Sequence, residues 1–279
     1  QISAIMGTVA GGQSYSPGLT DFIFMTKDSS MFIAGPAFVK TQLGEEITEV
    51  KLGGTSMHAR TSGVCHLVAD NDEDCLVKIR ELLTYLPSNN QQKPPFVDTG
   101  DDPNREDEEL NEIVPINPRQ PYDMKQVLSR IIDNGKLFEI QAKWAPNMIV
   151  GFARLGGYSV GIIASQPMIA AGSIDVWAAE KAARFIRFCD AFNIPIIFFQ
   201  DTPAYLIGPQ QERLGMIYRG ATLLYAVSEA TVPKLTIIVR KAYAGAYIAM
   251  GSKYLRADQV YAWPRAEIGG VAPETAGSI

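Results

Sequence analysis

The second half of the chain alternates apolar runs with segments of helical periodicity. Met148–Leu155 and Tyr158–Ser165 have strand composition and are separated by Gly156-Gly157, which predicts a hairpin. The segment 175–192 predicts an amphipathic helix with Lys181 off its apolar face. Ile194–Phe199 is a continuous apolar run, typical of a strand covered on both faces. Strands that alternate with helices in this way predict an α/β fold.

Other segments extend the alternation through the chain. Residues 211–230 predict one continuous helix, which is followed by a strand at Leu235–Val239. In the first half, residues 72–86 predict a helix with acidic side chains in its first turn. Short strands are expected at Ile2–Met6, Phe22–Met25 and Phe32–Ala34.

Composition limits the general class of protein. The chain has 279 residues, 47% of them hydrophobic, which is enough for a sizeable core. Its net charge of −5 argues against general nucleic-acid binding. Cys65, Cys75 and Cys189 are too scattered for a disulfide framework or a zinc ribbon. No apolar run reaches the roughly 20 residues that span a bilayer, and no signal or transit peptide is recognised.

Changes in composition predict two domains joined by a linker. We assign 1–95 to a first domain, 96–121 to the linker and 122–279 to a second domain, and we expect fold elements to be missing at both ends. The linker carries an acidic run at 98–112. A solvated surface is its favoured interpretation, because blocks of like charge usually stay in water, and an acidic binding site is the alternative.

Two turns of small residues follow predicted strands. Gly11-Gly12-Gln13-Ser14-Tyr15 follows the first strand, and Ala244-Gly245-Ala246-Tyr247 follows the strand at 235–239. A strand that enters a tight turn and a helix start points free backbone N–H groups into one place, where they can hold a developing oxyanion. Close packing alone is the ordinary explanation of a single such turn. The repetition indicates internal duplication and two carbonyl oxygens to stabilise.

At the level of motifs, the chain resembles the β-type carboxyltransferase subunit of biotin-dependent acyl-CoA carboxylases of the propionyl-CoA kind. It is also similar to the related transcarboxylases and biotin-dependent acyl-CoA decarboxylases. The segments that carry the resemblance are Ile5–Pro17, Gly151–Arg154, Arg184–Pro195, Ser228–Lys234 and Arg240–Tyr243. The resemblance implies a crotonase-like (ClpP/crotonase) ββα superhelix of two homologous domains, with the end of the first and most of the second in this chain.

The resemblance also implies a role for individual residues. Gly11 and Gly12 are expected to hold the thioester oxygen of an acyl-CoA, and Gly245 and Ala246 the urea oxygen of biotin. The enolate that forms from the acyl-CoA and the oxyanion that forms on biotin would then each receive hydrogen bonds from backbone N–H groups. No side-chain base is required, because the ureido nitrogen of biotin takes the α-proton. No metal is expected. The residues expected to line the two pockets are Ala10, Tyr15, His58, Tyr247, Ile248 and Asp201.

Several polar residues have alternative interpretations. Capping of the following turn is as good an explanation of Asp201 as a place beside biotin. His66 has apolar neighbours, which favour a packed histidine. Lys234, Arg240 and Lys241 could attract phosphates, but a solvated basic face is favoured, with Arg240 also expected in a structural pair.

Some segments depart from the family pattern. Pro203-Ala204-Tyr205 stands where relatives commonly have Pro-Gly-Phe, and Ile248 stands where propionyl-type enzymes often have Asp. The segments 218–222 and 268–272 also differ. These changes concern the acyl substrate more than the fold.

The partners are likewise implied by the resemblance. The chain has no biotinylation motif, so biotin must come from a biotin carboxyl carrier or biotin carboxylase subunit. The active site is expected between two subunits of a dimer or hexamer, in the bacterial cytoplasm or the mitochondrial matrix. The leading function is carboxyl transfer from carboxybiotin to a short acyl-CoA. The alternatives are a decarboxylase or transcarboxylase that runs the reaction in reverse, and a non-catalytic scaffold in the same complex.

Overall fold

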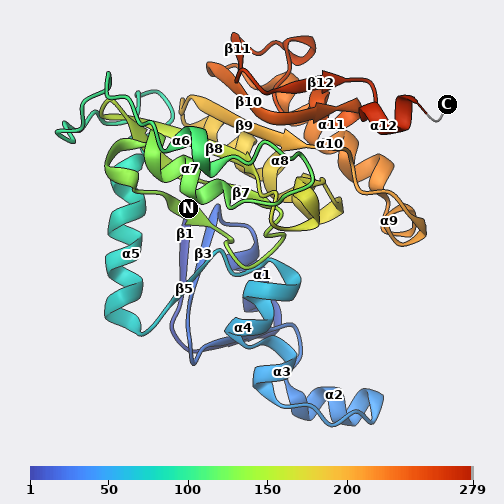
Figure 1. Ribbon diagram of the computed structural model, residues 1–279. Helices are drawn as coiled ribbons and strands as arrows, with labels where there is room; N and C mark the ends of the chain where they lie inside the picture. The colour runs from blue at the N-terminus through green and yellow to red at the C-terminus, as the bar shows by residue number, and fades with distance from the viewer. Residues whose placement is uncertain (278–279) are drawn as a thin grey trace. The chain divides into compact units, whose positions relative to one another are not determined.

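The chain forms two compact units in the computed structural model, which describes residues 1–277 (Figure 1). Unit 1 comprises Gln1–Thr84 with Ile140–Ala145, and unit 2 comprises Tyr85–Glu139 with the chain from Pro146 onward. Both units mix helices and strands, which confirms the α/β class. The division into two homologous domains with a linker at 96–121 stays a prediction.

Unit 1 contains two small parallel sheets. One has the order β1-β3-β5, and in the other β2 pairs with β4. Apolar side chains such as Ile23, Met25 and Met31 form its core, and every residue of β3 is buried. The strands are β1 (Ile2–Ile5), β2 (Thr8–Ala10), β3 (Phe22–Thr26), β4 (Ser30–Phe32) and β5 (Leu67–Ala69).

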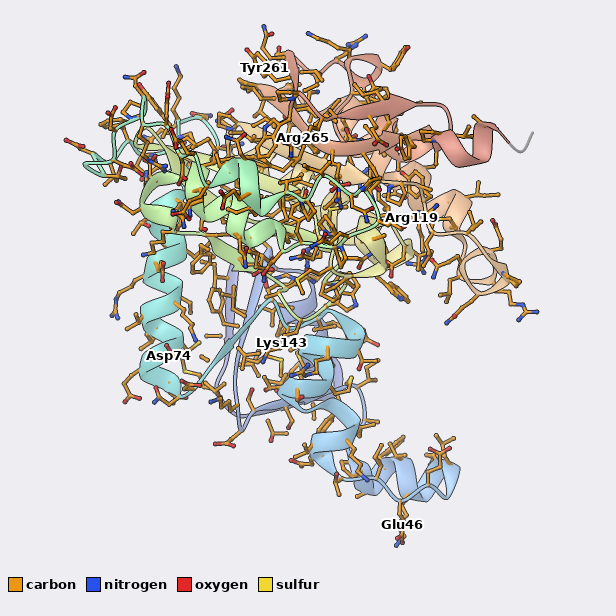
Figure 2. The ribbon with its side chains drawn as sticks, viewed as in Figure 1. Glu46, Asp74, Arg119, Lys143, Tyr261 and Arg265 are labelled. Carbon is orange, nitrogen blue, oxygen red and sulfur yellow. The ribbon has the colours of Figure 1, made fainter. Side chains whose placement is uncertain are left out.

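Three of the helices of unit 1, α2, α3 and α4, were not predicted from the sequence pattern. The strand expected at Phe32–Ala34 is misplaced, because β4 ends at Phe32 and Gly35 and Pro36 start α2. The side chain of Asp74 lies near the start of α5, whose acidic first turn suits the helix dipole (Figure 2). The helices are α1 (Tyr15–Gly18), α2 (Pro36–Leu43), α3 (Glu49–Gly53), α4 (Thr55–Met57) and α5 (Asp72–Tyr85).

Unit 2 is built on a larger mixed sheet in the order β11-β10-β9-β8-β7-β6, with β12 paired to β10. The predicted hairpin is confirmed as antiparallel β7 and β8, whereas β8, β9, β10 and β11 run parallel. The strands are β6 (Phe138–Ile140), β7 (Met148–Leu155), β8 (Tyr158–Ser165), β9 (Ile196–Thr202), β10 (Lys234–Tyr243), β11 (Gln259–Ala262) and β12 (Glu267–Gly269).

Helices connect the parallel strands of unit 2. The side chain of Asp175 caps α8 by accepting a hydrogen bond from Ala178 N at 2.7 Å. The single helix expected at 211–230 is wrong: Gly215, with φ +81°, separates α9 from α10. The helices are α6 (Leu110–Ile113), α7 (Met124–Ile131), α8 (Val176–Ala191), α9 (Pro209–Arg213), α10 (Met216–Glu229), α11 (Ala244–Ala249) and α12 (Pro273–Ala276).

Most side chains of the acidic segment 98–112 face solvent, as expected, yet specific bonds hold the segment to unit 2. Arg105 pairs with Asp101 at 2.7 Å. The same guanidinium donates to the carbonyl oxygens of Ile131 and Ile132, at 3.4 and 3.2 Å, where α7 ends. The segment therefore supplies donors to terminal carbonyls that the helix itself leaves unpaired.

Lys181 contradicts its predicted place off the apolar face of α8, because the side chain is only 1% exposed. Burial lowers the pKa of its ammonium group to about 7, an effect that the charge of Glu139 opposes and that of Lys125 reinforces. The long apolar stem of lysine explains why helical periodicity misjudged this position.

This burial makes stability depend on pH. Between pH 7 and 10.5 the unfolded chain holds a proton on Lys181 that the folded chain has lost. The unfolding free energy of the wild type should therefore rise with pH across this window, by up to about 1.4 kcal/mol per pH unit. Urea unfolding at several pH values should show a flatter dependence for Lys181→Met. An identical slope in both proteins would contradict the assignment.

No helix in the described part of the chain combines the length and apolar character needed to span a membrane.

Candidate functional site

The first small-residue turn connects β2 to a short helical segment in unit 1. Ala10 is extended, with φ −136° and ψ 156°, and Gly11 follows with φ +71°. A 3-10 helix covers Gly11–Ser14 and leads into α1. No side chain caps this helix start. No heavy atom outside the immediate chain neighbours lies within 4 Å of where a Cβ on Gly11 or Gly12 would stand, so this turn is open.

The second turn connects β10 to α11 in unit 2. Tyr243 is extended, with φ −118° and ψ 150°, and Ala244 follows with φ +53°. No side chain caps α11 either. Unlike the first turn, this one has close neighbours: Ala246 is fully buried, and a Cβ on Gly245 would lie 3.6 Å from the ring of Tyr205, although Gly245 itself is exposed.

The two turns share a backbone pattern with a defined register. An extended residue ends the strand, a positive-φ residue follows, and a helical segment begins. By conformation Gly11 corresponds to Ala244, and Gly12 to Gly245. The expected counterparts Gly11-Gly12 and Gly245-Ala246 are therefore offset by one residue, and Gly12 and Gly245 are the residues that occupy equivalent places in the backbone. The repeat itself supports the predicted duplication.

The positive φ values predict unequal changes in stability when glycine and alanine are exchanged in the two turns. Gly11→Ala forces a side chain into the left-handed region and should lower the unfolding free energy by about 1–2 kcal/mol. Ala244→Gly relieves that strain while adding chain entropy to the unfolded state, so it should change stability by less than about 0.5 kcal/mol. Urea unfolding of both variants tests this. Equal losses would show that Ala244 is not strained.

Four of the predicted pocket residues lie near the turns in sequence, and they differ in exposure. Ala10 ends β2, and Tyr15 starts α1 with 59% of its surface exposed. Tyr247 and Ile248 lie on α11 and are half-buried. The Tyr247 ring meets that of Tyr254 edge-on, with centroids 6.4 Å apart. No ligand role is established by these positions, which stay predictions.

His58 and His66 are both held by protein groups. His58 Nε2 donates to Met31 O at 2.6 Å, which leaves Nδ1 to accept from Ser62 Oγ at 2.7 Å. His66 is buried and its Nδ1 accepts from Ile23 N at 3.1 Å, which confirms a packed histidine. A pocket role for His58 stays a prediction, and the imidazole as placed has no free nitrogen.

Asp201 is fully buried and forms a pair with Arg240, whose Nε lies 2.9 Å from Oδ2. The second oxygen, Oδ1, accepts from the backbone N of Lys241 at 3.1 Å. The structural pair expected for Arg240 is confirmed. The solvated basic face is wrong, because Lys234 and Arg240 are each 3% exposed and burial lowers the pKa of Lys234 and of Lys241.

Two further residues contact the second turn, and the sequence pattern had not singled them out as site residues. The hydroxyl of Tyr205 donates to Gly220 O at 3.2 Å, and a Cβ on Gly245 would lie 3.6 Å from its ring. Gln200 Nε2 lies 3.5 Å from Ala246 O. The sequence did hold a signal for Gln200, because a polar amide side chain directly follows the apolar run Ile194–Phe199.

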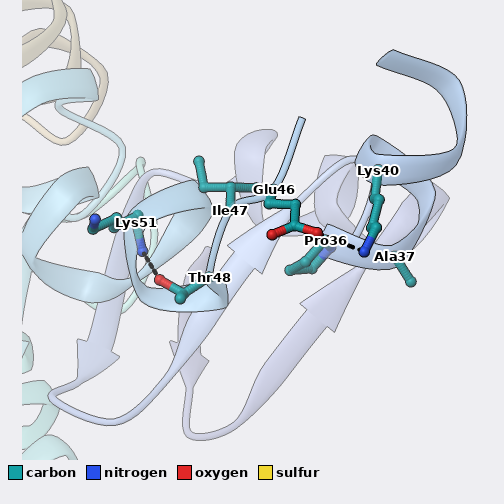
Figure 3. Close-up of a pocket in the computed structure, with 7 residues that line it drawn as sticks. All are labelled: Pro36, Ala37, Lys40, Glu46, Ile47, Thr48 and Lys51. Carbon is teal, nitrogen blue, oxygen red and sulfur yellow. Dashed lines mark hydrogen bonds and ion pairs between the residues drawn. The ribbon is translucent and has the colours of Figure 1, made fainter. Parts of the chain in front are cut away.

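Other concave or polar regions lie outside the two turns. A pocket of about 560 Å³ between α2 and α3 holds an ion pair between Lys40 and Glu46, 2.6 Å apart (Figure 3). Its lining contains none of the predicted site residues. Among the side chains that the structure describes, no three His, Cys, Asp or Glu come close enough to hold a metal ion.

Comparison with known proteins gives a consistent result. The family model described as "Carboxyl transferase domain" matches residues 1–279. Two relatives are each 56% identical over 280 residues: methylmalonyl-CoA decarboxylase subunit alpha of Veillonella parvula and the carboxyltransferase subunit of propionyl-CoA carboxylase of Haloferax mediterranei. Each alignment covers 100% of this chain but only 55% and 54% of the relative, so the chain spans about half their length.

A solved structure shows the same fold. The crystal structure of transcarboxylase 12S, with hydrolysed methylmalonyl-coenzyme A bound, superposes with a TM-score of 0.97 at 47% identity. The match covers 100% of this chain and 54% of that one. The crotonase-like α/β fold predicted from the sequence is confirmed.

Proposed function

The chain belongs to the carboxyl transferase domain family, and we propose that it transfers a carboxyl group between biotin and the α-carbon of a short acyl-CoA. The proposed substrate carries a short acyl group, as in propionyl-CoA or acetyl-CoA. The biotin is carried by another chain or domain, because no attachment motif is present here.

The observation that carries this proposal is the repeated turn. Each copy places a positive-φ residue between a strand and a helix start whose backbone N–H groups no side chain caps. The first N–H groups of a helix have no partner within the helix. Two such sets of donors suit a reaction in which two oxygens become negatively charged.

The first turn is proposed to serve the acyl-CoA. Backbone N–H groups of Gly11 and Gly12 would donate to the thioester oxygen and stabilise the enolate that forms when the α-proton leaves. The open space around both glycines supports close approach of a ligand to the backbone. The residues proposed to line this pocket are Ala10, Tyr15 and His58. The hydrogen bond from His58 Nε2 to Met31 O would hold the imidazole in its place in the pocket wall.

The second turn is proposed to serve biotin. Gly245 is exposed although Ala246 beside it is buried, so the backbone is accessible from one side only. Access from one side suits a ring whose urea oxygen accepts hydrogen bonds from the backbone. When bound, biotin would supply the carboxyl carrier and the group that takes the α-proton. Gly245 and Ala246 would orient the urea oxygen, and Tyr247 and Ile248 would line the pocket. Asp201 would support this side of the site by holding strand β10 in place.

The direction of transfer gives a second candidate function. The relatives at 56% identity include both a decarboxylase subunit and a carboxylase subunit. The same two sets of donors stabilise the same charges in either direction, because a catalyst accelerates both. A decarboxylase or transcarboxylase is therefore the alternative, and a non-catalytic scaffold is the outcome if the turns bind without turnover.

The assembly is proposed from the same family relation. A homo-oligomer, a dimer or hexamer, would bring the acyl-CoA turn of one subunit to the biotin turn of another. The partner would be a biotin carboxyl carrier or biotin carboxylase subunit. The proposed location is the bacterial cytoplasm, or the mitochondrial matrix in a eukaryote.

The test uses the full-length protein assembled with its biotinylated partner. ATP- and bicarbonate-dependent carboxylation is measured against acetyl-, propionyl- and butyryl-CoA, and release of CO2 from malonyl- and methylmalonyl-CoA is measured in parallel. Carboxylation of a short acyl-CoA supports the leading proposal, and biotin-dependent CO2 release alone supports the alternative. No biotin-dependent activity in either assay would reject both and leave the scaffold.

A further inference from the structure

The end of β9 contacts the second turn and its supporting strand through two consecutive side chains. Successive residues of a strand point to opposite faces of the sheet. Gln200 reaches α11 on one face, where its Nε2 lies 3.5 Å from Ala246 O. Asp201 reaches the supporting strand β10.

The contact of Asp201 coincides with an irregularity in β10. Ile238 pairs with Gln200 and Ala242 pairs with Thr202, so three residues of β10 stand opposite Asp201 alone. Such a bulge leaves a backbone amide without its ladder partner. The Asp201 carboxylate accepts from that amide, Lys241 N, and from the guanidinium of Arg240, so it holds the bulge in place.

Arg240 extends this support to a loop of unit 2. Its Nη1 donates to Asn117 O at 3.2 Å and to Gln120 O at 2.9 Å, and its guanidinium carbon lies 4.9 Å from the ring centre of Tyr122. These hydrogen bonds of the Arg240 guanidinium are all buried or part-buried. The strand that leads into Ala244 is therefore fixed at two places before the turn, by the side chain of Arg240 and by the backbone N of Lys241.

Gln200 differs from these residues because its amide is only partly used. The residue is fully buried, and its Oε1 has no hydrogen-bond partner among the described residues. An unsatisfied buried acceptor lowers stability, because it has lost its bonds to water and gained none in the protein. A methionine of similar length would avoid that cost, so a polar residue at this place needs a reason other than stability.

We propose that Gln200 is a positioning residue for the second turn: its amide holds the Ala246 carbonyl, and with it the orientation of the neighbouring backbone N–H groups, while Asp201 fixes the strand behind. This inference rests on the proposed function for its effect on catalysis. Its effect on the backbone is independent of that function.

The first test compares three variants of the full-length protein in its complex. Gln200→Met should keep stability and lower kcat about tenfold to a hundredfold, with KM for the acyl-CoA unchanged, because small displacements of donors are costly. The matched control is Gln166→Met. Gln166 is also buried in unit 2, but its amide bonds Met124 N and Asp123, so this change should affect stability without lowering kcat.

The third variant, Gln200→Glu, supplies a readout that a purely structural role would not give. A buried carboxyl group has a raised pKa, and its neutral form can donate to Ala246 O, whereas the carboxylate cannot. The kcat of this variant relative to wild type should therefore rise as the pH falls. A flat ratio would contradict the donor role.

Hydrogen exchange separates this proposal from the proposed function. Amides of residues 243–247 should exchange faster in Gln200→Met than in wild type, and not in Gln166→Met. An unchanged kcat in an active complex, or unchanged exchange at 243–247, overturns the proposal. If the wild-type complex has no biotin-dependent activity, the proposed function fails, and the exchange measurement still decides whether Gln200 holds the turn.

Discussion

Gly245→Val should lower the rate of carboxyl transfer by about a hundredfold to a thousandfold, the usual loss when one oxyanion donor is displaced. A Cβ on Gly245 would lie 3.6 and 3.7 Å from the Tyr205 ring, which is ordinary contact. The branched methyl groups of valine extend further and would collide with the ring or rotate the turn. The measurement is kcat of the assembled complex with its acyl-CoA.

Gly245→Ala is the matched control for this change. It adds only the Cβ that the Tyr205 ring can accommodate, and the φ of Gly245 is not positive, so the backbone need not move. We expect a loss of less than tenfold. Wild-type activity in both Gly245→Ala and Gly245→Val, with both proteins folded, would show that this turn does not hold a reacting oxygen.

Arg240→Met should lower the unfolding free energy by about 3–5 kcal/mol, because it leaves Asp201 as an uncompensated buried charge. Both members of the pair are almost completely shielded from water, at 3% and 0% exposure. The variant also loses the donors to the carbonyl oxygens of Asn117 and Gln120. Urea unfolding followed by near-ultraviolet circular dichroism measures the effect.

The control for this prediction is an exposed pair. Arg187 lies 2.6 Å from Glu229 with side chains 45% and 36% exposed, so Arg187→Met should cost less than about 1 kcal/mol. Replacing both members, Asp201→Leu with Arg240→Met, should recover much of the stability lost by Arg240→Met alone. Similar losses for Arg187→Met and Arg240→Met would contradict the importance assigned to burial.

Local patterns were sufficient where neighbouring residues decide the structure. The hairpin of β7 and β8 has the predicted bounds, because two apolar runs flank Gly156-Gly157. The helix α5 follows from its acidic start and apolar periodicity. The two turns were found because each has a small-residue signature directly after a strand.

Other features depend on residues far apart in the sequence. Arg240 looked like a surface charge because its partners, Asp201 and the carbonyls of 117–120, lie in other segments. Lys181 was misplaced because helical periodicity counts a lysine as polar, although its long apolar stem can be buried. The break between α9 and α10 at Gly215 was missed, since a single glycine is often tolerated within a helix. The register of the two turns required the φ values themselves.

The most direct measurement is transfer of a radiolabelled carboxyl group between an acyl-CoA and the biotinylated partner, followed in wild type, Gly12→Val and Gly245→Val. These glycines occupy equivalent positions in the two turns, and neither has a positive φ. Label should move in the wild-type complex and should move at least a hundredfold more slowly in each variant. Transfer at the wild-type rate in either folded variant would contradict the assignment of an oxygen to that turn.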